Sequence, residues 1–410
     1  MRIFIAPLFS SIVVVSAFAQ GSLTPPGAPA PVMKTLSQIE PRTPISSLPY
    51  TITNPGSYYV TTNLTGISGQ NGVTLNASDI TLDLSGFELA GVPGSLAGIQ
   101  APNEVTNIFI HNGTVRNWGG NGLELNLTHE SRVEHVHAQR NGGLGIGLGG
   151  GDLVENCSAI SNTFTGISAF GVIRNCAAIG NGSDGISGET LQSCMAEGNG
   201  GNGVHSSISI VDCSAAYNHR DGILIESGGL ISRSAAQFNS GNGIEARFSD
   251  LIRDCSAYNN GATGIVAAVS CRIVSCVIEG NTIGISAGQA STVKDCTVRN
   301  SSGDGIVVPN DCVVQDNDCV DNGSMGGAGV HVTIAGNRIE GNTTILNSKG
   351  IWIEGAANMV VRNISRYNPG SGSIGSSNFV INAGNTVGEI LNFSSGGTIT
   401  NANPWANFSY

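Results

Sequence analysis

A glycine followed by an aliphatic residue recurs along most of the chain at intervals of 18 to 24 residues. Between these pairs, short runs of alternating apolar and polar residues are separated by Asn, Gly, Asp and Ser, which are typical of tight turns. A short, nearly constant period of this kind predicts a stack of equivalent coils. The glycines that mark the period are Gly98, Gly122, Gly145, Gly166, Gly185, Gly203, Gly222, Gly243, Gly264, Gly284, Gly305, Gly329 and Gly350.

The repeat at residues 172–186 illustrates the predicted coil. It contains short strand-like runs and turn residues, and no stretch of the chain has a sustained helical period. The 58 glycines among 410 residues also disfavour helices. These features predict an all-β fold, a parallel β-helix of about 15 coils and roughly 70 Å in length at about 4.8 Å per coil.

Equivalent positions of successive coils should stack into columns. Two columns are visible in the sequence, one of cysteines and one of asparagines, and we expect both to point into the coil. Cysteine is small and apolar, so it fits a tight interior, and stacked Asn side chains can hydrogen-bond to one another along the axis. The first column contains Cys157, Cys176, Cys194, Cys213, Ser234, Cys255, Cys276, Cys296 and Cys319. The second contains Asn141, Asn162, Asn181, Asn199, Asn218 and Asn239. We expect free thiols in the first column, with Cys271 and Cys312 the better candidates for a disulfide.

The ends of the chain differ from the repeats. Residues 1–19 resemble a signal peptide, with a basic start, an apolar stretch and a small-residue cleavage site. Residues 20–47 are Pro-rich and are expected to form a linker and an N-terminal cap. The β-helix should span 48–369, with a C-terminal cap at 370–410. The sequence therefore predicts a secreted or cell-envelope protein without a membrane span.

The repeats from about residue 50 to 365 resemble those of right-handed parallel β-helix proteins in the pectin-lyase-like superfamily. The segments Leu23–Pro29 and Asn403–Phe408 resemble those of a group of exported bacterial β-helix proteins with no established activity. The resemblance implies a right-handed helix. It implies no single function, because this superfamily includes lyases, hydrolases, epimerases, adhesins and structural proteins.

Charge narrows the choice of partner. The formal net charge is −11, and Lys34, Lys294 and Lys349 are the lysines of the chain. Nucleic-acid binding depends on Lys and Arg, so a nucleic acid is not expected as a partner. The same argument disfavours a strongly anionic polysaccharide.

The catalytic signatures of the polygalacturonase-like, pectate-lyase-like and epimerase-like members are absent from the sequence. The best candidate for a carboxylate pair is Asp295 and Asp318, each directly before a cysteine of the column. In consecutive coils they would lie about 4.8 Å apart, a spacing that suits a retaining glycosidase or a calcium ion. The alternative is that both are ordinary turn residues.

A ligand-binding candidate follows the Gly-aliphatic pairs. The next residue should point outward, and His331 and Trp352 occupy this position in adjacent coils, with Glu354 two residues further on. An exposed Trp beside His and Glu could bind a sugar, because an aromatic face packs on apolar C–H groups. The alternative is a set of unrelated surface side chains.

A metal-binding candidate is the pair His135 and His137, with His111 in the preceding coil, since three imidazoles could bind zinc. The alternative is solvated histidines, and no cofactor is required by the sequence, although calcium stays open. The favoured function is an exported glycan-binding or structural protein without a recognisable catalytic site and with a polysaccharide as partner. The alternative is a polysaccharide lyase or glycoside hydrolase with its site on the outer face of the coils that contain residues 295–354.

Overall fold

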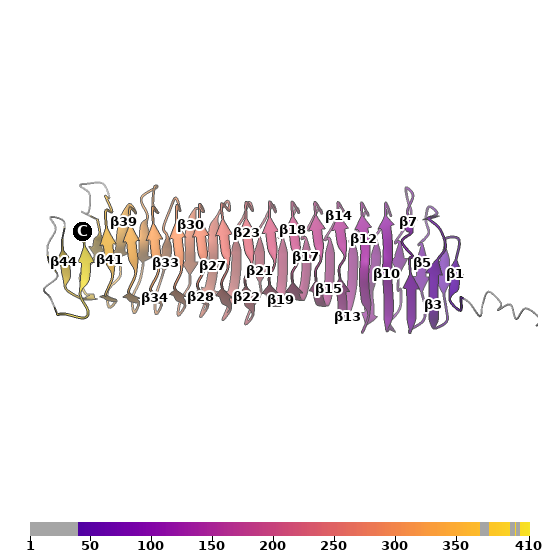
Figure 1. The fold of residues 1–410 in the computed structure, drawn as a ribbon, viewed down its shortest axis with the longest axis horizontal. Helices are drawn as coiled ribbons and strands as arrows, with labels where there is room; N and C mark the ends of the chain where they lie inside the picture. Colours follow the sequence, from indigo (N-terminus) through magenta and orange to yellow (C-terminus); the bar gives the residue numbers. More distant parts are fainter. Residues whose placement is uncertain (1–39, 370–376, 394–397, 399–401) are drawn as a thin grey trace, which may run out of the picture. The chain divides into compact units, whose positions relative to one another are not determined.

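The computed structural model describes residues 40–369, 377–393, 398 and 402–410. The expected signal peptide at 1–19 and most of the expected linker at 20–47 lie outside these ranges. The chain divides into two units, and the second, Arg42–Tyr410, contains all described strands. By itself this unit is a right-handed parallel β-helix of about 16 turns, close to the expected 15 (Figure 1). The described residues contain no helix.

Each coil contributes strands to three faces, and each strand pairs in parallel with its equivalents in neighbouring coils. The coil formed by β21 (Ile223–Ile225), β22 (Leu230–Ser232) and β23 (Ala235–Gln237) is typical. Its first strand begins directly after Gly222, so the Gly-aliphatic pairs of the sequence open face 1 of every regular coil. In β13, β15, β17 and β19 the strands of faces 1 and 2 join into one long bent strand, and in β10 and β12 those of faces 2 and 3 do.

The strand bounds follow the faces. Face 1 contains β2 (Tyr50–Ile52), β5 (Val73–Leu75), β8 (Ile99–Gln100), β11 (Leu123–His129), β13 (Ile146–Glu155), β15 (Ile167–Arg174), β17 (Ile186–Gln192), β19 (Val204–Val211), β21, β24 (Ile244–Phe248), β27 (Thr263–Val269), β30 (Ile283–Ala287), β33 (Ile306–Val308), β36 (Ala328–Val332), β39 (Lys349–Ile353) and β42 (Phe379–Ile381). Face 2 contains β1 (Thr43–Ile45), β3 (Gly56–Val60), β6 (Ile80–Asp83), β10 (Ile108–Arg116), β12 (Arg132–Gln139), β22, β25 (Leu251–Arg253), β28 (Arg272–Val274), β31 (Thr292–Lys294), β34 (Val313–Gln315), β37 (Arg338–Glu340), β40 (Met359–Val361) and β43 (Thr386–Val387). The short strand β9 (Val105–Thr106) pairs with the end of β11, after face 1. Face 3 contains β4 (Leu64–Thr65), β7 (Glu88–Ala90), β14 (Ser158–Ile160), β16 (Ala177–Ile179), β18 (Met195–Glu197), β20 (Ser214–Ala216), β23, β26 (Ser256–Tyr258), β29 (Val277–Glu279), β32 (Thr297–Arg299), β35 (Asp318–Val320), β38 (Thr343–Ile345), β41 (Ile364–Arg366), β44 (Ile390–Asn392) and β45 (Asn407–Ser409).

Stacking extends beyond both expected boundaries of the β-helix. At the N-terminal end β1 pairs with β3, within the segment expected to be linker. Near the C-terminus, in the segment expected to be a cap, β42, β43 and β45 pair with β39, β40 and β41. These strands add a further coil, and β44 pairs with β45 beyond it.

The Asn column lies inside a corner and is longer than expected. The Asn141 Nδ2 donates to Asn162 Oδ1 at 2.9 Å, and the same bond repeats in each coil down to Asn260 and Asn281 at 3.1 Å. The Oδ1 of each amide also accepts the backbone N–H of the preceding member, as Asn162 does from Asn141 at 3.1 Å. Each buried corner amide therefore satisfies polar groups of the neighbouring coil, as buried backbone groups require.

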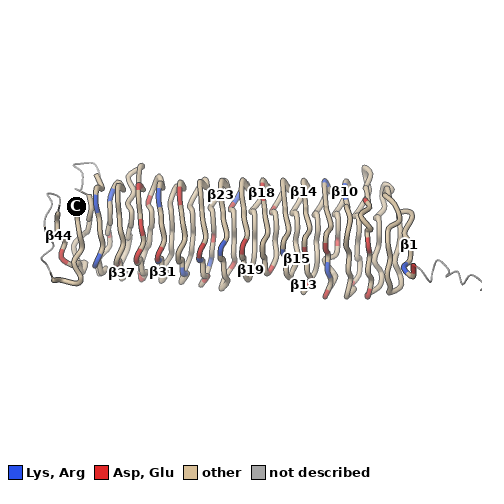
Figure 2. The backbone as a smooth tube through the Cα atoms, in the orientation of Figure 1, with Lys and Arg blue, Asp and Glu red and all other residues tan. Residues whose placement is uncertain are grey.

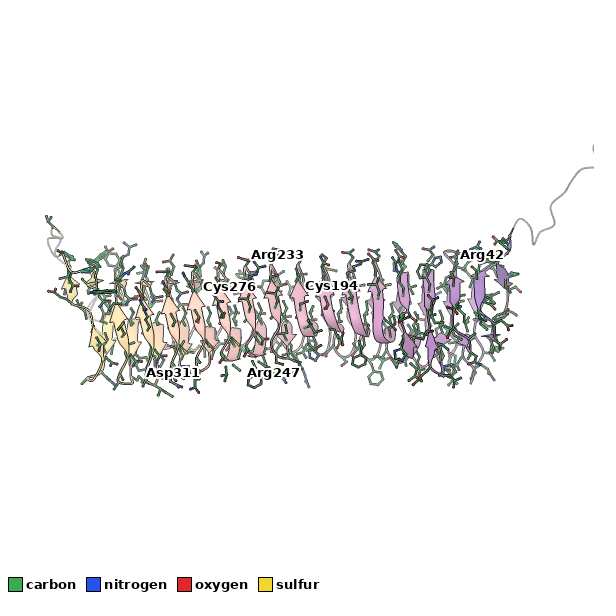
Figure 3. The ribbon with its side chains drawn as sticks, turned by 90° about the horizontal axis from the view of Figure 1, so that it is seen from below. Arg42, Cys194, Arg233, Arg247, Cys276 and Asp311 are labelled. Atoms are coloured by element: carbon green, nitrogen blue, oxygen red, sulfur yellow. The ribbon has the colours of Figure 1, made fainter. Side chains whose placement is uncertain are left out.

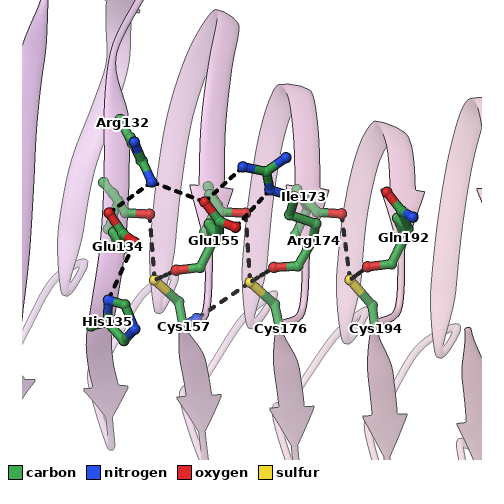
Figure 4. Close-up of polar contacts among 12 residues, drawn as sticks. Arg132, Glu134, His135, Glu155, Cys157, Ile173, Arg174, Cys176, Gln192 and Cys194 are labelled. Carbon is green, nitrogen blue, oxygen red and sulfur yellow. Dashed lines mark hydrogen bonds and ion pairs between the residues drawn. The ribbon is translucent and has the colours of Figure 1, made fainter.

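The Cys column is confirmed from Cys157 to Cys296, and all of these thiols are buried. Figure 4 shows Cys157, Cys176 and Cys194 side by side in successive coils. Cys319 does not belong to it, so the expected register was wrong there. The Cys296 N–H donates to Asn317 Oδ1 at 2.9 Å, which makes Asn317 the next member, and Cys319 pairs with Val298 on face 3. All ten cysteines are free, including Cys271 and Cys312, so the expected disulfide candidates were also wrong.

Candidate functional site

The outward side of face 1 carries a cluster around His331. His331 of β36 pairs in register with Trp352 of β39, as the sequence predicted. The two rings are stacked, with centroids 4.0 Å apart and an interplanar angle of 4°. Although His331 points outward, it is only 8% exposed. The neighbouring side chains therefore form a wall around the imidazole.

Asp304 fixes the imidazole from the preceding coil. Its Oδ1 accepts the backbone N–H of Ala328 at 2.7 Å, and its Oδ2 lies 2.9 Å from His331 Nδ1. Because an ionised carboxylate can only accept, the Nδ1 carries the proton in this bond. This role of Asp304 was not predicted from the sequence. The identifying signal is its position directly before Gly305, one coil before His331.

Glu354 and Lys349 complete the cluster. The Glu354 Oε2 lies 3.4 Å from His331 Nε2, a buried atom without a hydrogen-bond partner. The Lys349 Nζ lies 3.5 Å from the centroid of the Trp352 ring and donates to the carbonyl of Gly326 at 3.1 Å. Trp352 is therefore not the bare aromatic platform that the sequence suggested, because His331 covers one ring face and an ammonium group lies over the ring. What it presents to solvent is a partly exposed ring bordered by a carboxylate and an ammonium group.

Asp295 and Asp318 do not stack on each other, so their expected register was wrong. Lys294 pairs with Gln315 and Thr297 with Asp318, which puts Asp295 beside Asp316. The sequence analysis failed here because it aligned the two aspartates through Cys319.

Asp295 belongs to a column of turn residues with φ between 48° and 57°. This left-handed conformation favours Asn and Asp among residues with a side chain, which explains their frequency in the column. The column consists of Asn156, Asn175, Ser193, Asp212, Arg233, Asp254, Ser275, Asp295 and Asp316.

The three histidines near the N-terminal end have separate environments. His135 and His137 line an open depression of about 390 Å³. The His135 Nδ1 lies 3.5 Å from Glu134 Oε1, and the His137 Nδ1 lies 2.7 Å from Ser158 Oγ. His111 instead stacks on Phe109 and has its Nδ1 3.6 Å from Asp83 Oδ1. Within the described residues, no group of three His, Cys, Asp or Glu side chains is arranged to hold a metal ion.

A second polar cluster, around His205, also lies on the outward side of face 1. Its Nε2 lies 2.9 Å from Glu226 Oε1, and the other oxygen of Glu226 lies 2.9 Å from Arg247. In the next coils, burial and the nearby Asp221 carboxylate raise the pKa of Glu245. His205, like His331, stands two residues after a repeat glycine, but no site was predicted there from the sequence.

Charged side chains of both signs are interspersed along the stack (Figure 2). Arg247, which borders the His205 cluster, lies on the edge of the stack opposite Arg233 in Figure 3. The His205 cluster therefore lies on a different side from the corner that carries Asp212 and Arg233. That corner has its own bidentate ion pair, with 2.7 Å from Arg233 Nε to Asp212 Oδ1.

The comparison with family models agrees with the observed fold. The family model described as "Right handed beta helix region" matches residues 201–323. The search of curated proteins gives no match. None of the described residues forms a helix long and apolar enough to cross a membrane.

Solved structures with similar folds share little sequence with this chain. The A-module of a mannuronan C-5 epimerase from Azotobacter vinelandii is 16% identical, over 74% of this chain and 87% of that chain, with a TM-score of 0.35. A periplasmic alginate epimerase is 11% identical, over 75% and 78%, with a TM-score of 0.41. The catalytic domain of an α-1,3-glucanase solved with tetrasaccharides is 13% identical, over 73% and 63%, with a TM-score of 0.42. The right-handed parallel β-helix is shown by the structure itself and agrees with the family model over residues 201–323, and identities this low say nothing about the activity of this chain.

Proposed function

We propose that this protein is an exported glycan-binding β-helix protein, and that the cluster of His331, Trp352 and Glu354 is part of its binding surface. The observation that carries the proposal is the stacked His331–Trp352 pair, held on the outward side of face 1 by Asp304. Export is proposed from the signal-peptide-like segment at residues 1–19.

The chemistry of the cluster suits a hydroxyl-rich ligand. The part of the Trp352 ring that stays exposed offers apolar contact to a sugar, and Glu354 and Lys349 at its border offer an acceptor and a donor for hydroxyls. The imidazole is already fixed by its bond to Asp304, so a ligand that contacts the cluster does not have to order it. Preorganisation of this kind lowers the entropic cost of binding.

The expected ligand is a neutral or aminated polysaccharide. The net charge of −11 and the carboxylates of Asp304 and Glu354 would repel a polyuronate. A polymer of glucosamine, whose amino groups are cationic at neutral or mildly acidic pH, and a neutral glucan are therefore the probes to compare with polygalacturonate. The enzyme alternative, a lyase or hydrolase acting with Asp295 and Asp318, has no specific geometric observation in its favour.

Affinity electrophoresis of the secreted protein in gels that contain each polysaccharide tests the proposal. We expect retardation by the glucosamine polymer or the neutral glucan, and a loss of about tenfold in affinity for Trp352→Ala, a loss typical of a central aromatic contact. Ser286→Ala, at the same outward position of face 1 in a coil without the cluster, should bind as the wild type does.

Two results would contradict the proposal. One is migration of the wild type that no polysaccharide changes, which leaves the structural rod as the better explanation. The other is retardation that Trp352→Ala leaves unchanged while its thermal unfolding matches that of the wild type. Release of reducing or unsaturated ends from any of the polysaccharides would instead support the enzyme alternative.

A further inference from the structure

The clusters around His205 and His331 occupy the same positions of the repeat. Each cluster takes one residue from each of three successive coils, at a fixed distance from the repeat glycine of that coil. The Asp stands directly before the glycine of the first coil. The His stands two residues after the glycine of the second coil, and the Glu four residues after the glycine of the third. The two sets are Asp184, His205 and Glu226, and Asp304, His331 and Glu354.

The contacts within the two sets correspond. Asp184 Oδ1 accepts the backbone N–H of Asn202 at 2.7 Å, as Asp304 Oδ1 accepts that of Ala328 at the same distance. The second oxygen of each aspartate faces the imidazole Nδ1, at 3.8 Å in the first set and 2.9 Å in the second.

The opposite side of each imidazole faces a glutamate, which lies 2.9 Å away in the first set and 3.4 Å away in the second. An apolar residue of the next coil pairs with each histidine, Leu224 with His205 and Trp352 with His331. Each imidazole thus lies between carboxylates of the preceding and following coils, although the hydrogen bond goes to Glu226 in the first set and to Asp304 in the second.

The His205 cluster also borders a hollow, which is a second and independent feature. The cavity has a volume of about 200 Å³, and its walls come from four successive coils. The lining residues include Phe170, Ser187, Glu189, His205, Ser207 and Glu226. The hollow exists because several outward residues here are serines, while Phe170 and Glu226 are long and stand at its border.

The lining has the composition of a sugar-binding site. Phe170 is 67% exposed and offers an apolar ring to a ligand. Serine hydroxyls, the imidazole and the carboxylates offer both donors and acceptors. Asp184, Glu189 and Glu226 outnumber Arg247, so the hollow favours a neutral or cationic group over an acidic one.

From these observations we infer that the hollow beside His205 is a second binding position for the same glycan, and that one extended chain lying along the stack occupies both positions. This inference rests on the proposed function. The two sets are six coils apart along face 1, from β17 to β33, which corresponds to about 29 Å at about 4.8 Å per coil. A polymer can span that distance and a disaccharide cannot.

The two-position arrangement makes binding depend on chain length. A polymer held at one position meets the second at high effective concentration, so loss of either position should lower polymer affinity by about tenfold or more. A disaccharide binds each position independently, so the loss of one position removes only about half of its binding capacity. Isothermal titration calorimetry with the glucosamine polymer and with the glucosamine disaccharide measures both quantities.

The variants are Phe170→Ala and His205→Ala at the hollow, Trp352→Ala at the other cluster, and, as the control, Thr297→Ala on the outward side of face 3. Phe170 is largely exposed, so its replacement should leave the thermal unfolding unchanged. We expect Phe170→Ala and His205→Ala to lower the affinity for the polymer as strongly as Trp352→Ala does. The control should bind the polymer as the wild type does.

Failure of this inference differs from failure of the proposed function. If Trp352→Ala weakens the polymer while both variants at the hollow bind it as the wild type, the second position is refuted and the proposed function stands. If the variants at the hollow lower the affinities for the disaccharide and for the polymer by equal factors, the two positions do not bind one glycan chain together. If the wild type binds neither probe, the proposed function fails and the second position fails with it.

Discussion

One inward corner of this β-helix is built from thiols in the middle of the stack and from amides near its C-terminal end. From Cys157 to Cys296 the column between faces 2 and 3 consists of cysteines and Ser234, and from Asn317 it continues through Asn342, Asn363 and Asn407. The backbone path is the same, and every member of both segments is buried. The same corner therefore accepts two chemically different solutions.

The two segments differ in how well their side chains hydrogen-bond to the buried backbone groups of the corner. In the thiol segment the Sγ of Cys157 donates to the carbonyl of Glu155 at 3.2 Å, and the Cys157 N–H reaches only the Sγ of Cys176 at 3.5 Å (Figure 4). In the amide segment the Asn317 N–H and Nδ2 both donate to Asn342 Oδ1, at 3.1 and 2.9 Å. Thiols are weak donors and acceptors, so the thiol segment depends on packing and the amide segment on hydrogen bonds.

Alkaline pH should produce the largest difference between the segments. Hydrogen bonding to the neighbouring thiol and burial raise the pKa of Cys176, Cys213 and Cys255. For Cys276 a bond with Cys255 lowers the pKa, but Cys296 and burial raise it further, to about 12. The folded-state pKa values thus exceed the unfolded value of about 8.5. The stability from these thiols is full below that pH and is lost as pH rises toward the folded values.

The loss approaches about 1.4 kcal/mol per pH unit for each thiol, so several kcal/mol should disappear between pH 8 and pH 10. Urea unfolding at both pH values, followed by Trp fluorescence, measures it. Mapping of iodoacetamide-labelled thiols then identifies which coils open first. Equal unfolding midpoints at the two pH values would be incompatible with buried thiols in this column.

Removal of one amide should have the next largest effect. Asn342 is fully buried, accepts from Asn317, and donates to Val314 O at 2.8 Å and to Asn363 Oδ1 at 3.0 Å. Asn342→Ala leaves buried donors of Asn317 without an acceptor, and each such group costs about 1–3 kcal/mol. We therefore expect a loss of about 3–5 kcal/mol in the free energy of unfolding, measured by urea denaturation at pH 7. Thr343→Ala, on the adjacent outward position, should change it by about 0.5 kcal/mol or less.

A thiol-to-hydroxyl change should have the smallest effect. Ser234 already occupies the thiol segment, where its Oγ donates to Ser232 O at 2.9 Å and accepts the Cys213 N–H at 3.1 Å. Cys276→Ser should find the equivalent partners, the Val274 carbonyl and the Cys255 N–H, and cost about 1 kcal/mol or less at pH 7. Because it removes a titrating thiol, it should also reduce the loss at pH 10. A cost above that of Asn342→Ala would mean that the thiol segment requires sulfur.

Much of the fold was predictable because the repeat is explicit. The Gly-aliphatic pairs locate the strands of face 1, and alternation then separates inward residues such as Val330 from outward ones such as His331 and Trp352. The predicted register was wrong at Cys319 because the column cannot be followed by residue type alone. Asn317 fits the corner as well as a cysteine does, so two cysteines in neighbouring coils can belong to different columns.

The candidate site was predictable only in part. Adjacency of His331 and Trp352 followed from the repeat, since both stand two residues after a glycine. The contacts of Asp304 and Lys349 did not, because the loops between coils vary in length and decide where these side chains reach. The hollow beside His205 depends on the absence of bulk at several serines across three coils.

By itself the sequence determined the period, the three-strand coil and the residues that face the interior, because glycine, turn residues and alternation act within a few residues. Only the tertiary structure decided which residues of coils with unequal length lie side by side, and therefore which histidines meet an aspartate and a glutamate. That choice is made by hydrogen bonds between coils, which join positions about twenty residues apart and fix the register one coil at a time.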